Sequence, residues 1–117
     1  MTEIDLIDES WVAVPPAQLV GVLTADGLWQ SWFPRLGRVV FMDRAEKGVR
    51  WSVTGELVGS VEVWLEAFGD GTIVHWYLRA DAPSGDAGRL RERYIRAINE
   101  GMFLVKDEAE GRGPDAG

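Results

Sequence analysis

The sequence predicts an α+β fold in which one antiparallel sheet packs against a long C-terminal helix. Two observations carry this prediction. The pair Asp70-Gly71 joins two strand-like segments that share one apolar face, and the last part of the chain changes to a helical period. The apolar stripe of that helix needs a partner, and the apolar face of the sheet is the large surface that can provide one.

The first strand is predicted over residues 4–14 and is followed by two short helices. Pro15 and Pro16 end the strand because neither can donate a backbone hydrogen bond to a sheet. Pro16 fits the first turn of a helix that runs to Leu23. Asp26 is the expected N-cap of a second helix that ends before Pro34. Its apolar stripe consists of Leu28, Trp29, Trp32 and Phe33.

An antiparallel meander is predicted to follow. With Asp70-Gly71 as a two-residue turn, Phe68 pairs with Ile73, and a turn over residues 57–59 sets Val53 opposite Val63. The strands of the meander are residues 37–43, 48–55, 61–68 and 72–81. The last two strands then share a face without polar side chains, made of Val61, Val63, Leu65, Ala67, Val74, Trp76, Leu78 and Ala80.

A long amphipathic helix is predicted from Asp86 or Gly88 to about Glu110. A glycine in a helix costs up to about 1 kcal/mol relative to alanine. Gly101 therefore indicates a bend or a close contact with another element. The inner stripe of this helix contains Leu90, Tyr94, Ala97, Ile98, Gly101, Met102 and Val105.

Length and charge narrow the class of protein further. The 117 residues predict one domain over residues 1–110 and a flexible tail over residues 111–117. The chain has no cysteine, which excludes disulfides and fits a cytoplasmic protein. The net charge of −7 lies at the two ends, because residues 11–106 contain equal numbers of acidic and basic side chains. We expect no nucleic-acid partner and no membrane insertion, since the body is not basic and no segment reaches about 20 apolar residues.

Five segments carry a resemblance to a known superfamily: residues 4–16, Trp29, the triplet Trp32-Phe33-Pro34, residues 48–55 and residues 106–108. The chain resembles the actinobacterial branch of the START-like (SRPBCC) superfamily, which includes polyketide cyclase/dehydrase and lipid-transport-like proteins. This resemblance implies a helix-grip fold, with a cavity between the sheet and the C-terminal helix for a small hydrophobic or aromatic, lipid- or polyketide-like ligand. The expected ligand-binding residues are Trp29, Trp32, Phe33, Trp51, Val63, Leu65, Trp76, Leu78, Tyr94, Ile98 and Met102.

The tryptophans in this set have two interpretations. They form aromatic walls for a flat ligand or they fill the core, and the same rings can do both. The relatives also have more strands than the four that fit between Leu36 and Pro83. A short domain of this kind can complete itself by forming a homodimer.

Three residues are weak candidates for acid–base chemistry. A bulge-free first strand directs the Asp8 carboxyl inward, where burial would raise its pKa, whereas a bulge turns it outward. Tyr94 brings a hydroxyl to the apolar stripe, where it bonds a ligand carbonyl or a backbone group. His75 lies on the other sheet face, as an acid or base beside Tyr77 or as a solvated neighbour of Glu66.

No metal and no cofactor are expected. A single histidine without cysteine does not fit the usual zinc ligand sets. The sequence also contains no glycine-rich phosphate loop and no nucleophile elbow.

Three functional hypotheses follow. The leading one is binding of a small hydrophobic ligand, and the first alternative is an aromatase/cyclase-dehydratase-type enzyme acting on a polyketide-like substrate. The second alternative is a self-associating protein with a vestigial cavity, which an apolar set on the polar sheet face favours. That set is Trp64, Phe68, Ile73 and Tyr77.

Overall fold

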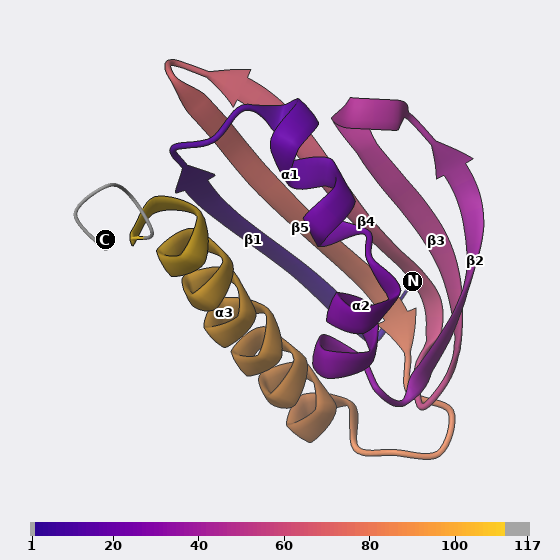
Figure 1. The fold of residues 1–117 in the computed structure, drawn as a ribbon. Helices are drawn as coiled ribbons and strands as arrows, with labels where there is room; N and C mark the ends of the chain where they lie inside the picture. The colour runs from indigo at the N-terminus through magenta and orange to yellow at the C-terminus, as the bar shows by residue number, and fades with distance from the viewer. Residues whose placement is uncertain (1, 112–117) are drawn as a thin grey trace.

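The computed structural model describes residues 2–111 as one antiparallel sheet with helices packed on it (Figure 1). The predicted α+β class and the predicted order of elements are both confirmed. Helix α3 ends one residue inside the predicted tail, and the rest of that tail lies outside the described residues. In chain order the elements are β1 (Ile4–Val12), α1 (Pro16–Leu23), α2 (Asp26–Trp32), β2 (Leu36–Asp43), the 3₁₀ turn η1 (Ala45–Lys47), β3 (Gly48–Gly55), β4 (Val58–Phe68), β5 (Gly71–Asp81) and α3 (Ala87–Gly111).

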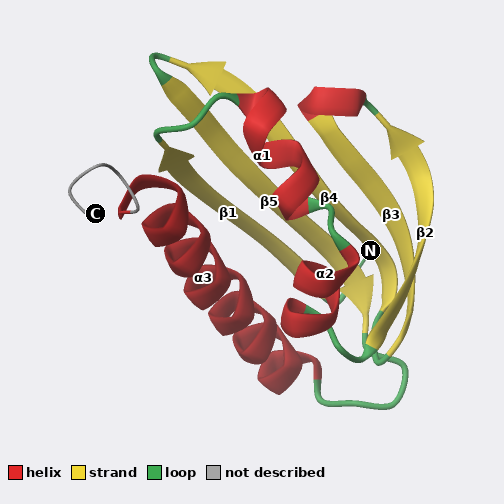
Figure 2. Cartoon of the chain, viewed as in Figure 1, coloured by secondary structure: helices red, strands yellow, loops and turns green. Residues whose placement is uncertain are grey.

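The sheet has the strand order β1-β5-β4-β3-β2. Strands β2 to β5 form the predicted meander, and β1 adds to it beside β5. All three α-helices lie on one face of the curved sheet, which we call the inner face (Figure 2). Helix α3 packs along β1 and α1 packs on β4, so β2 and β3 form the side of the sheet that α3 does not cover.

The β4–β5 hairpin has a different turn from the predicted one. Phe68 pairs with Gly71 rather than with Ile73, so the turn residues are Gly69-Asp70. Gly69 has a φ of 61°, in the left-handed region that glycine enters without steric cost. The predicted register is wrong by two residues, and because side chains alternate with a period of two, every side chain keeps its predicted face.

The β3–β4 connection is also tighter than predicted. Val53 pairs with Gly59 rather than with Val63, because β4 begins at Val58 and only Glu56-Leu57 form the turn. Gly55 precedes this turn at a φ of 115°, and a side chain there would collide with a backbone oxygen. The shift is again an even number of residues, so the predicted faces persist.

The predicted apolar face forms the core with the stripe of α3. Its members are buried with the exception of Ala67, which is exposed near the far end of β4. Gly101 lies against the indole ring of Trp32, and a Cβ atom on Gly101 would overlap that ring. Of the two interpretations of Gly101, a bend or a close contact, the structure therefore shows the close contact.

Two boundaries of the N-terminal elements differ from the prediction. Strand β1 ends at Val12 rather than at Val14, whereas α1 begins at Pro16 as predicted. Helix α2 begins at Asp26 itself, with Ala25 at the N-cap and no side-chain cap. The prediction of Asp26 as an N-cap is wrong because its carboxylate pairs with Arg38 instead.

The C-terminal turns of α3 are tied to the end of β1. Lys106 Nζ donates to the Trp11 carbonyl at 2.7 Å, and Glu110 accepts a hydrogen bond from the Ala13 amide at 2.7 Å. The Ala13 amide and then Lys106 hold the pKa of Glu110 below its ordinary value. Among the described residues, no helix has the length and apolar character needed to cross a membrane.

Candidate ligand-binding site

The space between the sheet and α3 is filled by the aromatic residues that the sequence predicted there. Phe33 lies 6.1 Å from Trp76 and 5.9 Å from Tyr94, measured between ring centroids. Trp32 is the only half-buried member of the predicted ligand-binding set; the others are buried and pack together in one core. The fold thus brings the predicted ligand-binding residues together in the core. The hollows of the inner face lie at the edges of this core.

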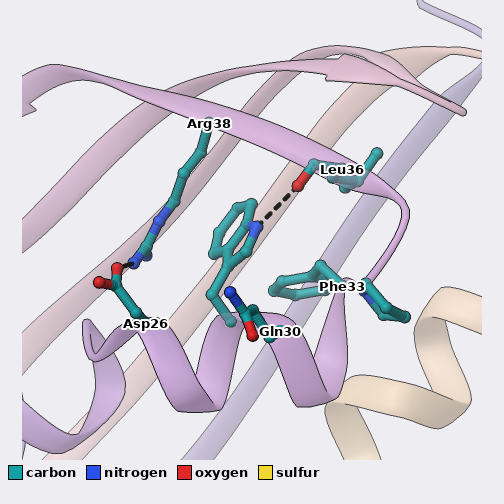
Figure 3. A pocket seen from close by; sticks show the side chains of 7 residues that line it. Asp26, Gln30, Phe33, Leu36 and Arg38 are labelled. Carbon is teal, nitrogen blue, oxygen red and sulfur yellow. Dashed lines mark hydrogen bonds and ion pairs between the residues drawn. The ribbon is translucent and has the colours of Figure 1, made fainter.

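One of these hollows lies between α2 and β2 and has a volume of about 520 Å³ (Figure 3). The Trp29 ring forms a wall of it and is fixed by a hydrogen bond of 2.9 Å from Nε1 to the Leu36 carbonyl oxygen. Trp29 also contacts Phe33 at 4.7 Å and Trp51 at 5.0 Å between ring centroids. The full lining consists of Asp26, Trp29, Gln30, Phe33, Pro34, Leu36 and Arg38.

Arg38 supplies the positive charge of this hollow. It pairs with Val53 across the sheet, so its side chain shares the inner face with the core. The guanidinium carbon lies 4.6 Å from the centroid of the Trp29 ring and 5.0 Å from that of Trp51. Cations are attracted to such ring faces, and these contacts hold the guanidinium in place.

Only one of the two terminal nitrogens of Arg38 makes hydrogen bonds within residues 2–111. Nη2 donates to Asp26 Oδ1 at 2.6 Å and to the Thr24 carbonyl at 3.3 Å, and Figure 3 shows the ion pair with Asp26. Nη1 is buried and has no acceptor among the described residues. Buried donors are nearly always paired in native proteins, so this atom needs an explanation.

A second, smaller hollow of about 280 Å³ flanks Arg38 and Asp26 on the side of β3. It includes Asp43, whose Oδ1 is already occupied by the Ala45 amide at 2.8 Å. Its lining is Thr24, Asp26, Arg38, Val40, Asp43, Val49 and Trp51.

An apolar groove of about 480 Å³ lies between the short helices and α3. Trp32 is the one predicted ligand-binding residue in it. The lining is Val14, Gln18, Leu19, Val22, Leu28, Ser31, Trp32, Gly101, Leu104, Val105, Glu108 and Ala109. This groove has apolar walls and no cationic side chain, in contrast to the hollow around Arg38.

Asp8 faces inward, as a bulge-free first strand predicts. β1 pairs with β5 without a break, and Asp8 lies opposite Trp76 on the inner face. Burial raises the pKa of the Asp8 carboxyl, opposed by a hydrogen bond from Ser10 and assisted by the charge of Glu9. The alternative of a bulge that turns Asp8 outward is wrong.

The Tyr94 hydroxyl does not bond a backbone group, because it donates to Glu56 Oε2 at 2.8 Å. Arg93 donates to the other oxygen of Glu56 at 2.6 Å. Burial raises the pKa of Tyr94, and the hydrogen bond and negative charge of Glu56 raise it further. Burial also pushes the pKa of Glu56 upward, but the hydrogen bonds from Tyr94 and Arg93 outweigh it and keep that pKa below its ordinary value.

His75 lies on the outer face of the sheet, away from the helices and from the hollow. Its ring nitrogens are each 3.0 Å from a carboxylate oxygen, one of Glu9 on β1 and one of Glu66 on β4. Trp64, its cross-strand partner, stacks on the ring at 4.4 Å. The contact with Glu66 is confirmed, but the expectation of a solvated side chain is wrong, because the ring is buried under these neighbours.

The three candidates for acid–base chemistry therefore do not form one site. Asp8 faces the helices from β1, Tyr94 lies on α3 and bonds Glu56, and His75 lies on the opposite side of the sheet. Sequence reasoning missed Arg38, which is the functional candidate that the fold creates. The available signal was the alternation of the strand: Arg38 lies two residues from Leu36 and two from Val40, so a charged side chain shares a strand face with two apolar ones.

Comparisons with known proteins agree with this architecture. No family model and no curated protein matches the chain. Among solved structures, it is similar to DR_A0006 from Deinococcus radiodurans, with a TM-score of 0.68, 14% identity, and 92% of this chain and 98% of that chain covered. It is also similar to the Aha1 dimer from Colwellia psychrerythraea, with a TM-score of 0.66, 14% identity and coverage of 92% and 96%. For CalU16 from Micromonospora echinospora the TM-score is 0.61 at 14% identity, with 90% and 82% covered.

Two of these structures are covered almost completely, at 96% and 98% of their length. Identities at this level establish the fold. The chain has a helix-grip fold, in which an antiparallel sheet packs against a long C-terminal helix.

Proposed function

We propose that this protein binds a small hydrophobic or aromatic molecule, of the lipid- or polyketide-like class, in the hollow between α2 and β2. The observation that carries the proposal is a rigid aromatic wall beside a hollow of about 520 Å³. Small-molecule sites typically measure about 300–1,000 Å³ and combine aromatic walls with a few polar groups. Trp29 and Phe33 supply the walls, and Gln30 and Arg38 supply the polar groups.

The fixed position of the Trp29 ring favours a ligand-binding site over a chance depression of the surface. The Trp29 ring is fixed by Leu36, by two neighbouring aromatic rings and by Arg38. A wall that is already ordered costs little conformational entropy when a flat ligand stacks on it.

The test uses two flat probes of similar size, 2-naphthoate and the neutral 2-naphthalenemethanol, titrated by calorimetry and by tryptophan fluorescence. Gln30→Phe places a ring at the mouth of the hollow from an exposed position, so we expect it to weaken binding of both probes. Val22→Phe is the matched control, because it places the same ring in the apolar groove.

The variant that loses affinity for the probes identifies the binding site. A loss of affinity in Gln30→Phe alone supports the hollow. A loss of affinity in Val22→Phe alone places the binding site in the groove and overturns the proposal. If neither probe binds the wild-type protein or raises its melting temperature, the binding function itself is refuted.

Self-association is the second candidate, and the free edge of the sheet favours it. Within residues 2–111, strand β2 pairs with β3 alone, and it carries four consecutive exposed apolar residues. Such an edge can pair with a second chain. These residues are Val39, Val40, Phe41 and Met42. Sedimentation velocity over a wide concentration range tests this candidate, and a monomer throughout would refute it.

The apolar set on the outer face that the sequence predicted is less exposed than this edge. Phe68 is exposed, whereas Trp64, Ile73 and Tyr77 are half-buried. A homodimer through that face remains a prediction, as does the aromatase/cyclase-type enzyme. Loss of turnover with retained binding after substitution of Asp8, Tyr94 or His75 would support the enzyme.

A further inference from the structure

We infer that the ligand of this hollow is a planar aromatic acid and that Arg38 is the residue that selects its carboxylate. The inference rests on the proposed function and adds the chemical class of the ligand. Its basis is the uneven pairing of the two terminal nitrogens of Arg38.

A guanidinium matches a carboxylate best when two parallel N–H groups donate to its two oxygens. Arg38 uses only Nη2 in this way, toward Asp26, and Nη1 is left buried without an acceptor. Leaving a buried donor unpaired is costly, and the cost is greater for a charged group. A ligand carboxylate that engages both nitrogens removes that cost.

The partner that Arg38 has in this structure is poorly placed to hold it. The Asp26 side chain is 93% exposed, whereas that of Arg38 is 15% exposed. Ion pairs between exposed side chains contribute only about 0.2–1 kcal/mol, and the Asp26 carboxylate stays largely in contact with water in this pair. A ligand carboxylate in the hollow can therefore compete with Asp26 for the guanidinium at small cost.

The surroundings of Arg38 favour an aromatic acid over a free inorganic anion. Trp29 and Trp51 lie against the guanidinium, so an anion that reaches it also meets an indole face. The other carboxylate near Arg38, that of Asp43, is held by the Ala45 amide. The hollow thus offers one cation and an aromatic wall to a molecule that carries both a flat ring system and a negative charge.

The experiment compares the affinities of 2-naphthoate and 2-naphthalenemethanol at neutral pH. Hydrogen bonds to charged groups contribute enough for a preference of at least about tenfold for 2-naphthoate in the wild-type protein. Arg38→Met keeps an apolar stem between the two indole rings, and we expect it to abolish this preference while leaving the affinity for the alcohol nearly unchanged.

Asp26→Asn is expected to act in the opposite direction. It removes the competing carboxylate from an exposed position, and the preference for 2-naphthoate should rise by about two- to fivefold. Asp70→Asn, in the β4–β5 turn, changes the net charge equally and should leave the preference unchanged.

The outcomes separate this inference from the proposed function. Binding of both probes with equal affinity, or a preference that neither Arg38→Met nor Asp26→Asn alters, overturns the inference and leaves the proposed function standing. Failure of both probes to bind refutes the function and the inference together. If circular dichroism shows that Arg38→Met is unfolded, the comparison of Asp26→Asn with Asp70→Asn decides.

Discussion

Replacing Gly101 by alanine tests how tightly α3 packs on α2. Helix propensity by itself predicts a gain of about 1 kcal/mol in the free energy of unfolding. The new Cβ atom would overlap the Trp32 ring, which is itself packed 5.2 Å from Trp76 and 6.1 Å from Phe33 between centroids. Overpacking costs about 1–3 kcal/mol. We therefore expect a net loss of up to about 2 kcal/mol, and each kcal/mol lowers the melting temperature of a chain of this size by roughly 3–6 °C.

The assay is thermal and urea denaturation of Gly101→Ala in two backgrounds. In the Trp32→Leu background the overlapping ring is absent, so the same substitution should stabilise the protein by about 1 kcal/mol relative to Trp32→Leu alone. Gly88→Ala in the same helix is the control, since its Cβ would meet only Asp86 Oδ1 at 3.5 Å. An effect of Gly101→Ala that has the same sign in both backgrounds would refute the packing argument.

Three further predictions concern titratable groups. Tyr94→Phe removes the hydroxyl that bonds the ionised Glu56, so it should destabilise the protein by about 1–2 kcal/mol at neutral pH. Because the pKa of Glu56 is lowered in the folded protein, that difference should shrink as acid protonates the carboxylate; a difference independent of pH in urea titrations would contradict this. Burial raises the pKa of Asp8, so the folded protein favours the protonated carboxyl. The stability that this form contributes is lost as the pH rises through the raised pKa. The melting temperature of Asp8→Asn should therefore rise relative to that of wild type between acidic and neutral pH. A constant gap between the two melting curves would count against the buried carboxyl. Glu110→Gln should reduce the hydrogen-exchange protection of the Ala13 amide at neutral pH, and because the pKa of Glu110 is lowered, wild type should approach the variant in acid. Unchanged protection of Ala13 would show that this tether does not order the end of β1.

The faces of the strands could be predicted from the sequence, and their registers could not. The alternation in β4 and β5 places Val63 and Trp76 on the buried face and His75 on the other, as observed. Both hairpins nevertheless differ from the prediction by an even number of residues. The hydrophobic pattern is unchanged by such a slip, so the turn alone decides the register. At Gly69 the turn uses a left-handed glycine before the aspartate, rather than the Asp-Gly pair that the sequence favours.

The environments of the polar residues depended on neighbours that are distant in sequence. His75 is buried because β1 pairs beside β5 and brings Glu9 to one side of its ring, while Glu66 on β4 lies on the other side. Tyr94 finds its acceptor in Glu56, a residue of the β3–β4 turn. Neither partnership follows from local periodicity, because the order of strands in a sheet is set by tertiary packing.

The sequence by itself determined the α+β class, the order of the elements, the apolar faces and that Gly101 marks either a bend or a close contact. These depend on periodicity and on the special properties of glycine and proline, which act within a few residues. Only the tertiary structure decided where the hollow lies and that Arg38 enters it with one nitrogen unpaired. The physical reason is that the hollow is what remains after α2 and β2 pack around the aromatic core, and its shape and charge depend on side chains that meet only in the folded chain.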